Sequence, residues 1–453
     1  MSSVELTRSP FARAILKSRW PQLAAQLVLL AGLALAIASG LLGTPVGSRS
    51  FAIVMVWIVW WAALMLVAVP WLGRAWCSVC PLPLPGEWLQ RGVIGGPPRR
   101  GSGFARGLRW PRRLRGMWVQ NGAFLAVAIL SLPVLTQPRW TGILLVGLIV
   151  AAVALSLVFE RRAFCRYVCP VGGFIGLYSQ VAPVEVRVRD AALCASHSTK
   201  TCYTGSDWGY GCPWNVFPGS LSVNTYCGLC MECLRTCPYD NVAINLRPVG
   251  ADLTRPGLRG LDETFKAILL LGSGLAYTLV LLGPWARTRT AAAAVGSAAW
   301  LLYAFGFLTF VAVALPALLL AATRLGLWLS RIRLAPTTAL RTLSPALIPL
   351  GLSVWIAFSL SFLLANLSYA GPVLSDPLNL GWNLLGTAGI GWVPIAPVLI
   401  PWVTIGVLIA GLAWSSQRLG AIAEDLRGGP RLAWPLRVVG LALTISALVV
   451  LAS

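Results

Sequence analysis

The sequence predicts an all-α, multi-pass membrane protein that carries one small α+β insert on the cytoplasmic side. Of its 453 residues, 57% are hydrophobic and only 11% are charged, whereas about a quarter of the residues in a soluble globular domain carry charge. Several apolar runs also reach the roughly 20 residues that a helix needs to cross about 30 Å of hydrocarbon. One polar segment, rich in cysteine, glycine and proline, interrupts these runs. The composition therefore excludes a soluble globular chain.

About nine apolar runs are long enough to span a membrane. They divide the chain into an N-terminal four-helix membrane domain (1–181), a polar insert (182–262) and a C-terminal membrane domain of about five helices (263–453). A cleaved signal peptide is the alternative for the first run, because Ala36 and Ala38 form a small-residue pattern, but the later spans favour a retained helix. The runs are residues 23–42, 51–69, 117–135, 143–159, 264–282, 300–322, 346–369, 397–414 and 438–451.

The placement of charge predicts the orientation. A formal net charge of +22 would indicate nucleic-acid binding in a soluble protein, but here the basic residues gather in short loops between apolar runs, so the expected partner is the lipid membrane and not nucleic acid. Residues 370–396, by contrast, carry only Asp376. We therefore expect the N-terminus and the insert on the cytoplasmic side of a bacterial inner membrane. The loop 73–116 sets nine arginines against Glu87: Arg74, Arg91, Arg99, Arg100, Arg106, Arg109, Arg112, Arg113 and Arg115.

The strongest chemical signal is a run of four cysteines in the insert. Cys227, Cys230, Cys233 and Cys237, followed by Pro238, have the spacing C-x2-C-x2-C-x3-C-P, which is typical of bacterial ferredoxins and their [4Fe–4S] clusters. A structural zinc site would need only one C-x2-C pair and a distant second pair. Disulfides are disfavoured in a cytoplasmic segment. The spacing therefore predicts a ferredoxin-type insert that holds a [4Fe–4S] cluster.

Three further cysteines precede this run and predict a second cluster. In two-cluster ferredoxins the fourth cysteine of each run binds the other cluster. Cys212, which is followed by a proline, would then complete the site of Cys227, Cys230 and Cys233, and Cys237 would join Cys194 and Cys202. That second site lacks one thiolate. His197 is a candidate fourth ligand, and the alternative is a surface histidine beside a three-cysteine site.

The remaining four cysteines belong to an internal repeat at the membrane edge. Arg74-Ala-Trp-Cys77-Ser-Val-Cys80-Pro81 follows the second apolar run, and Arg162-Ala-Phe-Cys165-Arg-Tyr-Val-Cys169-Pro170 follows the fourth. Two similar hairpins that pack side by side would bring the four thiols together. The four thiolates would then hold a third cluster or a metal ion, or two of them would cycle as a redox dithiol. The alternative is a pair of helix-terminating Cys-Pro turns.

These motifs together resemble the membrane-bound polyferredoxin family, which includes the membrane ferredoxin subunit of periplasmic nitrate reductase, the nitrous-oxide reductase regulator and the oxidase-assembly iron–sulfur protein. The resemblance covers about residues 23–248 and leaves out the five C-terminal spans. The family usually has C-x3-C-P in both repeats, whereas Cys77 and Cys80 are one residue closer. The resemblance implies iron–sulfur clusters and an electron-transfer role.

The expected function is that of an electron carrier and not of a stand-alone enzyme. The chain would relay electrons between a cytoplasmic donor or the quinol pool and a membrane-associated partner, either a redox protein or a quinone. No haem is expected, because His197 is the only histidine of the chain and lies in the insert. Two alternatives are an accessory protein for metalloenzyme assembly or for copper or iron uptake, and a permease in which the clusters are regulatory.

The orientation can be tested with reporter fusions. A reporter fused after Gly260 should behave as cytoplasmic and one fused after Asp376 as extracytoplasmic, because three apolar runs separate the two positions. Protease accessibility of each fusion in sealed vesicles provides the measurement. The same side for both reporters would show that the number of spans between them is wrong.

Overall fold

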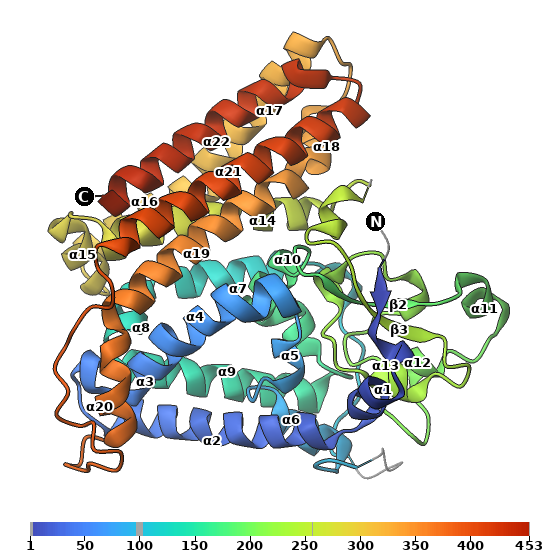
Figure 1. The fold of residues 1–453 in the computed structure, drawn as a ribbon, viewed down its shortest axis with the longest axis horizontal. Helices are drawn as coiled ribbons and strands as arrows, with labels where there is room; N and C mark the ends of the chain where they lie inside the picture. Colours follow the sequence, from blue (N-terminus) through green and yellow to red (C-terminus); the bar gives the residue numbers. More distant parts are fainter. Residues whose placement is uncertain (1–2, 97–102, 256, 453) are drawn as a thin grey trace. The chain divides into compact units, whose positions relative to one another are not determined.

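The computed structural model describes residues 3–96, 103–255 and 257–452 and is mostly helical, with one three-stranded sheet in these residues (Figure 1). Arg99 and Arg100 of the predicted basic loop lie outside the described residues. The chain forms two compact units. The first contains Met1–Leu35, Val67–Gln120 and Leu144–Asp252, and the second contains Ala36–Leu66, Asn121–Ile143 and Leu253–Ser453.

Eight helices of the described residues are long and apolar enough to cross a membrane. Each overlaps one of the predicted apolar runs, so the multi-pass character expected from the composition is confirmed for these segments. They are Trp20–Leu42, Phe51–Leu72, Pro138–Val158, Leu261–Leu282, Ala298–Ser330, Pro336–Ser375, Leu399–Asp425 and Gly429–Leu451.

The remaining predicted span, residues 117–135, is not one continuous helix. It consists of α7 (Trp118–Ala128) and α8 (Ser131–Thr136), which are separated by a turn at Ile129 and Leu130. Pro133 explains the break, because its nitrogen carries no hydrogen for the carbonyl of Ile129 and its ring crowds that carbonyl. Composition alone predicted the apolar length correctly but not the interruption.

The first unit contains the sheet. Strands β1 (Val4–Glu5), β3 (Val242–Leu246) and β2 (Val184–Val188) pair in that order, and both pairs are antiparallel. The register sets Val184 opposite Leu246. Side chains alternate across a strand, and one face of the sheet buries an apolar core that consists of Val186, Leu229, Leu234, Val242 and Ile244. The cysteine run of the insert packs against this core.

The N-terminal segment is part of the same unit, which the sequence did not indicate. It supplies β1 and the helix α1 (Pro10–Lys17), which Ser9 caps by accepting a hydrogen bond from the Ala12 N–H. Ion pairs hold the segment in place, because Arg13 and Lys17 of α1 both contact the Asp240 carboxylate. The residues before the first span therefore fold onto the insert.

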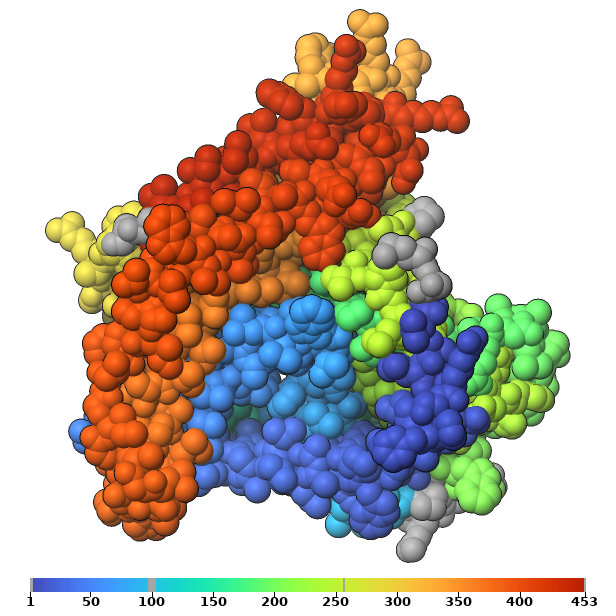
Figure 2. All heavy atoms as spheres, viewed as in Figure 1, coloured from blue at the N-terminus to red at the C-terminus, as the bar shows by residue number. Residues whose placement is uncertain are grey.

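The second unit is a helical bundle. Helix α19 (Leu347–Asn366) packs against α14 (Leu261–Tyr277) and α21 (Leu399–Asp425), and α21 packs against α22 (Gly429–Ala452). The spheres of Figure 2 show α21 and α22, in red, closely packed side by side. Small residues allow the close approach, as is usual between membrane helices. Gly411, for example, leaves no room for a methyl group beside the Ser353 side chain.

The other helices of the second unit complete the bundle. Besides α8, they are α3 (Phe51–Ile53), α4 (Trp61–Ala63), α15 (Ala286–Ala293), α16 (Ala298–Thr309), α17 (Leu315–Ser330), α18 (Pro336–Leu343) and α20 (Ala370–Ser375). The first unit adds short helices that carry or flank cysteines: α5 (Trp76–Val79), α6 (Leu84–Arg91), α10 (Pro170–Tyr178), α11 (Ala191–Ser196), α12 (Thr201–Thr204) and α13 (Glu232–Thr236). Helices α2 (Trp20–Leu42) and α9 (Pro138–Val158) form two of the long apolar spans.

Candidate metal centres

All eleven cysteines carry free thiols, lie in the first unit and are buried or half-buried. Their neighbours suggest three groups, although two of these also adjoin: Cys212 contributes to the raised pKa of Cys202, and Cys202 to that of Cys233. Desolvation disfavours a buried thiolate, and a second thiolate nearby disfavours it further. Each group is therefore a set of sulfur atoms that ionise together only beside a cation.

Cys212 and the first three cysteines of the run form one group, which we call the insert group. Cys212, Cys227, Cys230 and Cys233 line a single cavity, and Cys237 does not. Burial raises the pKa of the Cys230 thiol to about 12, and the neighbouring Cys212 thiol adds to the rise. Burial likewise raises the pKa of Cys227 to about 11.

Backbone amides of the loop point at these sulfur atoms. The N–H of Val216 lies 3.4 Å from the sulfur of Cys212, and the N–H groups of Leu229 and Glu232 donate to Cys227 and Cys230. Leu229 and Met231 adopt positive φ angles of 48° and 62°, which residues other than glycine rarely adopt. The run therefore curls tightly around the cavity, with its donors turned inward.

The arrangement of the thiols suits a multi-iron cluster better than a single metal ion. Zinc bound at about 2.3 Å by four thiolates would need sulfur atoms roughly 3.8 Å apart. No three histidine, cysteine, aspartate or glutamate side chains of the described residues come together closely enough to hold one metal ion. In a cubane each thiolate binds a different iron atom, so the sulfur ligands lie further apart. Four thiols that line one cavity, with N–H groups turned toward them, are the type of ligand that such a cluster needs.

Cys194, Cys202 and Cys237 form a second group. Burial raises the pKa of the Cys202 thiol to about 11, and Cys237 and Cys194 contribute to the rise. Asn241 joins two members, because its backbone N–H lies 3.3 Å from the sulfur of Cys237 and its side-chain amide lies 3.2 Å from that of Cys194. The sequence analysis missed Asn241, whose position four residues after Cys237 is its only signal.

His197 lies beside an aromatic side chain and close to Cys194 in the sequence. Its ring packs against Tyr239, with the ring centroids 4.5 Å apart. Its Nδ1 is buried and has no hydrogen-bond partner among the described atoms. His197 ends α11, three residues after Cys194. The geometry leaves one ring nitrogen uncommitted, so a ligand role for His197 stays a prediction.

The membrane-edge repeats bring Cys77, Cys80, Cys165 and Cys169 together as a third group, which we call the membrane-edge group. Burial raises the pKa of Cys169 to about 11, although the Gly172 N–H, 3.3 Å from the sulfur, opposes the rise. The four thiols therefore lie near one another, and a metal or cluster site that they share stays a prediction.

Helical geometry explains the unequal spacing of the two pairs. Cys77 lies in the α-helical turn of α5, which ends at Cys80. Cys165 lies in the π-helical segment Phe164–Val168, where the Cys169 N–H donates to the carbonyl of Phe164 at 2.8 Å. A π-helical turn accommodates one residue more than an α-helical turn. The π-helical turn thereby accommodates the extra residue between Cys165 and Cys169.

A buried ion pair lies between the two repeats. Arg162 donates to both carboxylate oxygens of Glu87, with 2.9 Å between the second nitrogen and its oxygen. Both side chains are buried, at 4% and 2% exposure. Burial opposes ionisation of Glu87, but the Arg162 charge holds the pKa of its carboxyl below the usual range. The pair is therefore charged on both sides.

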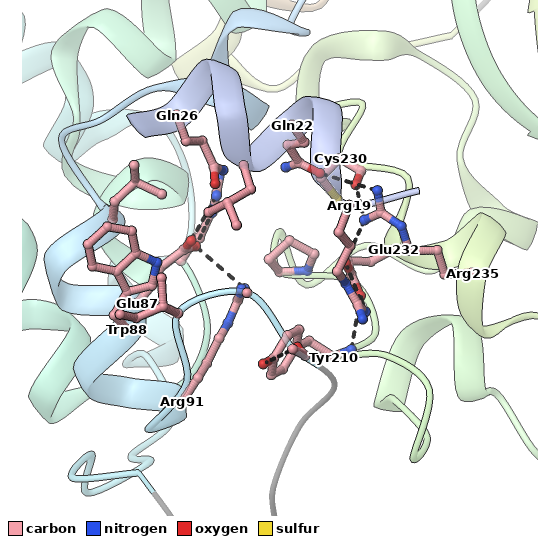
Figure 3. Close-up of a pocket in the computed structure, with 17 residues that line it drawn as sticks. Arg19, Gln22, Gln26, Glu87, Trp88, Arg91, Tyr210, Cys230, Glu232 and Arg235 are labelled. Atoms are coloured by element: carbon pink, nitrogen blue, oxygen red, sulfur yellow. Dashed lines mark hydrogen bonds and ion pairs between the residues drawn. The ribbon is translucent and has the colours of Figure 1, made fainter. Parts of the chain in front are cut away.

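This ion pair borders a polar cavity of about 50 Å³, enough for one or two water molecules. Figure 3 shows Glu87 and Arg91 on one side of the cavity and Arg19, Glu232 and Arg235 on the other. Cys230 of the insert group also lines it. The cavity thus connects the insert group with the charged residues of the repeats.

The contact between Gly228 and Trp214 can be tested by mutation. A methyl group at Gly228 would lie 1.9 Å from the Trp214 indole nitrogen, so Gly228→Ala should displace the indole, destabilise the unit by about 1–3 kcal/mol and lower iron retention. Thermal unfolding and iron content in detergent provide the measurements. Gly147→Ala, where nothing lies within 4 Å, is the control. Equal stability of the two variants would contradict this packing.

Comparison with known proteins places the repeats in a family. Residues 53–116 and 140–187 match the family described as a 4Fe-4S binding domain. The match includes the four cysteines of the membrane-edge group and leaves out those between 194 and 237. No solved structure matches the chain.

Two relatives agree with this family. The chain is 32% identical to the methylamine utilization ferredoxin-type protein MauN of Paracoccus denitrificans (strain Pd 1222) over 142 residues, which are 27% of this chain and 44% of the relative. It is 24% identical to the putative electron transport protein YccM of Escherichia coli (strain K12) over 133 residues, 29% of this chain and 35% of the relative. The chain thus spans less than half the length of either relative. The part of the chain that carries the repeats therefore resembles a ferredoxin-type protein and a putative electron transport protein, which supports the resemblance that its cysteine motifs indicate.

Proposed function

We propose that this chain is a membrane-bound iron–sulfur electron carrier, which relays electrons between a cytoplasmic donor or the quinol pool and a membrane-associated partner. The observation that carries the proposal is the presence of three buried thiol groups in one compact unit of a chain with eight apolar helices. A carrier needs several such sites close to one another and close to the bilayer.

Each thiol group has a distinct part in the proposal. Cys212, Cys227, Cys230 and Cys233 would hold one [4Fe–4S] cluster, and the membrane-edge group would hold another. Cys194, Cys202 and Cys237 would hold a third, with His197 as the candidate fourth ligand. Bound clusters supply one-electron redox chemistry. The protein residues bury the thiolates, exclude water and donate N–H groups to sulfur, which favours the more negatively charged, reduced state.

A quinone is one candidate membrane partner. The second unit contains a cavity of about 620 Å³ with mostly apolar walls, including Leu279, Phe307 and Phe310. Ligand pockets usually measure about 300–1,000 Å³ and combine apolar walls with a few polar groups. The Tyr303 hydroxyl, on a residue that lines the cavity, is buried and has the Ser131 hydroxyl beside it. These features support a lipid-soluble, hydrogen-bonding partner.

The burial of the thiols also weighs against one alternative. A protein that delivers copper or iron to another site must expose its thiols so that the metal can be exchanged between ligands. Here every cysteine is buried or half-buried, which favours retention of the metal. The permease alternative makes a different prediction from electron transfer. It predicts solute flux across the membrane that survives removal of the clusters.

The division of the ligands can be tested with one matched pair of variants. Cys230→Ala should abolish the electron paramagnetic resonance (EPR) signal of the insert group, whereas Cys237→Ala should abolish the signal of the group that contains Cys194. Both variants remove one thiol from the same run, so each is the control for the other. Loss of one and the same signal in both variants would show that the run binds a single cluster. Wild-type iron and spectra in both would refute the ferredoxin-type assignment.

The shared membrane-edge site gives a second test. Cys77→Ser and Cys165→Ser come from different repeats but should remove the same EPR signal and the same amount of iron, because their thiols lie in one group. The signals of the other two groups should persist in both variants. Different losses in the two variants would mean that the repeats hold separate sites.

A further inference from the structure

The two repeats exchange their arginines. Arg74 and Arg162 each precede a cysteine of their own repeat by three residues. Each nevertheless donates to the backbone of the other repeat: Arg74 to the carbonyl of Cys165 at 3.3 Å, and Arg162 to the carbonyl of Cys77. Because each arginine fixes the cysteine of the opposite repeat, neither pair of thiols is positioned without the other.

The same two arginines reach the insert group. Arg74 donates to the carbonyl of Thr225, two residues before Cys227. Arg162 lines the same cavity as Cys230. Each arginine therefore donates to the backbone of the opposite repeat and also lies at the insert group.

The Trp214 side chain lies beside both cations. The guanidinium carbon of Arg74 is 4.2 Å from the centre of its ring and that of Arg162 is 5.9 Å away. Trp214 is 1% exposed, and its indole contacts Gly228 of the cysteine run. Two arginines and one indole thus form the contact between the membrane-edge group and the insert group.

Arg74 is a buried cation without a carboxylate partner. It is 2% exposed, and no ion pair joins it to an acidic side chain of the described residues. Gly176 makes room for it, since a methyl group there would lie 3.0 Å from the guanidinium. A buried charge is costly unless an opposite charge compensates it. The thiolates of the two groups are the negative charges available to Arg74, whereas Arg162 also has Glu87.

We propose that Arg74 and Arg162 are positioning residues that lock the two repeats together and supply one positive field shared by the membrane-edge and insert groups. The inference rests on the proposed function and adds to it how two neighbouring centres are tuned together. A cation beside a centre stabilises its reduced state, which carries more negative charge. Arg74 and Arg162 therefore raise the reduction potentials of both centres, and Glu87 moderates the effect of Arg162.

The test is an EPR-monitored redox titration of the full-length protein, loaded with iron and sulfide, in detergent. Arg74→Gln should shift the midpoint potentials of the membrane-edge and insert signals to more negative values. Glu87→Gln should shift both to more positive values, because Arg162 then loses its counter-charge. Arg74→Lys, which keeps the charge, should stay closer to the wild type than Arg74→Gln. Signals are assigned with Cys165→Ser and Cys230→Ala.

The protein offers two controls. The signal of the Cys194, Cys202 and Cys237 group should not move in any of these variants, and Arg113→Gln removes an exposed charge and should leave all three potentials unchanged. A purely structural role for Arg74 would change iron occupancy without the opposite shifts in potential expected of Arg74→Gln and Glu87→Gln. If Arg74→Gln fails to retain iron, the Glu87→Gln variant provides the test. Unshifted midpoint potentials of the membrane-edge and insert signals in Glu87→Gln would overturn the proposal. A wild-type protein without iron would instead refute the proposed function itself.

Discussion

The burial of sulfur is the constraint on which the rest of the first unit depends. Eleven thiols lie buried or half-buried in three groups, and each thiolate is unfavourable there without a cation. If the groups hold clusters as proposed, metal binding and folding would be one process, because the free energy of binding would also stabilise the fold. The small sheet, the N-terminal strand and the turns of the cysteine run all serve to hold sulfur atoms and inward N–H groups around these sites.

The membrane-edge group shows how a repeat can accept an irregular sequence. One pair of cysteines is a residue closer than the other, and the family resemblance alone left the equivalence of the pairs open. The π-helical turn at Phe164–Val168 compensates for the difference in spacing, because it contains one residue more than an α-helical turn. The exchanged arginines then link the pairs, so that a local change in either repeat affects the whole site.

Much of this organisation was predictable from local patterns. Apolar length predicted eight of the continuous spans. The ligand exchange of two-cluster ferredoxins led to the grouping of Cys212 with Cys227, Cys230 and Cys233, which line one cavity, and of Cys237 with Cys194; the ligand roles stay predictions. The sequence did not predict the interruption by Pro133, the N-terminal strand, or the contact of Arg74 with Thr225, which is 151 residues away. The spacing of residues in the sequence carries no information on contacts between distant segments. The repeat therefore revealed Arg74 and Arg162 but not what they contact.

Quantification of iron, acid-labile sulfide and zinc in the purified full-length protein, combined with EPR of the reduced state, tests the central claim most directly. Three buried thiol groups predict three distinguishable EPR signals and iron with an equal amount of sulfide for three four-iron clusters. Iron and sulfide for fewer than three clusters, or zinc in place of iron at any group, would contradict the account.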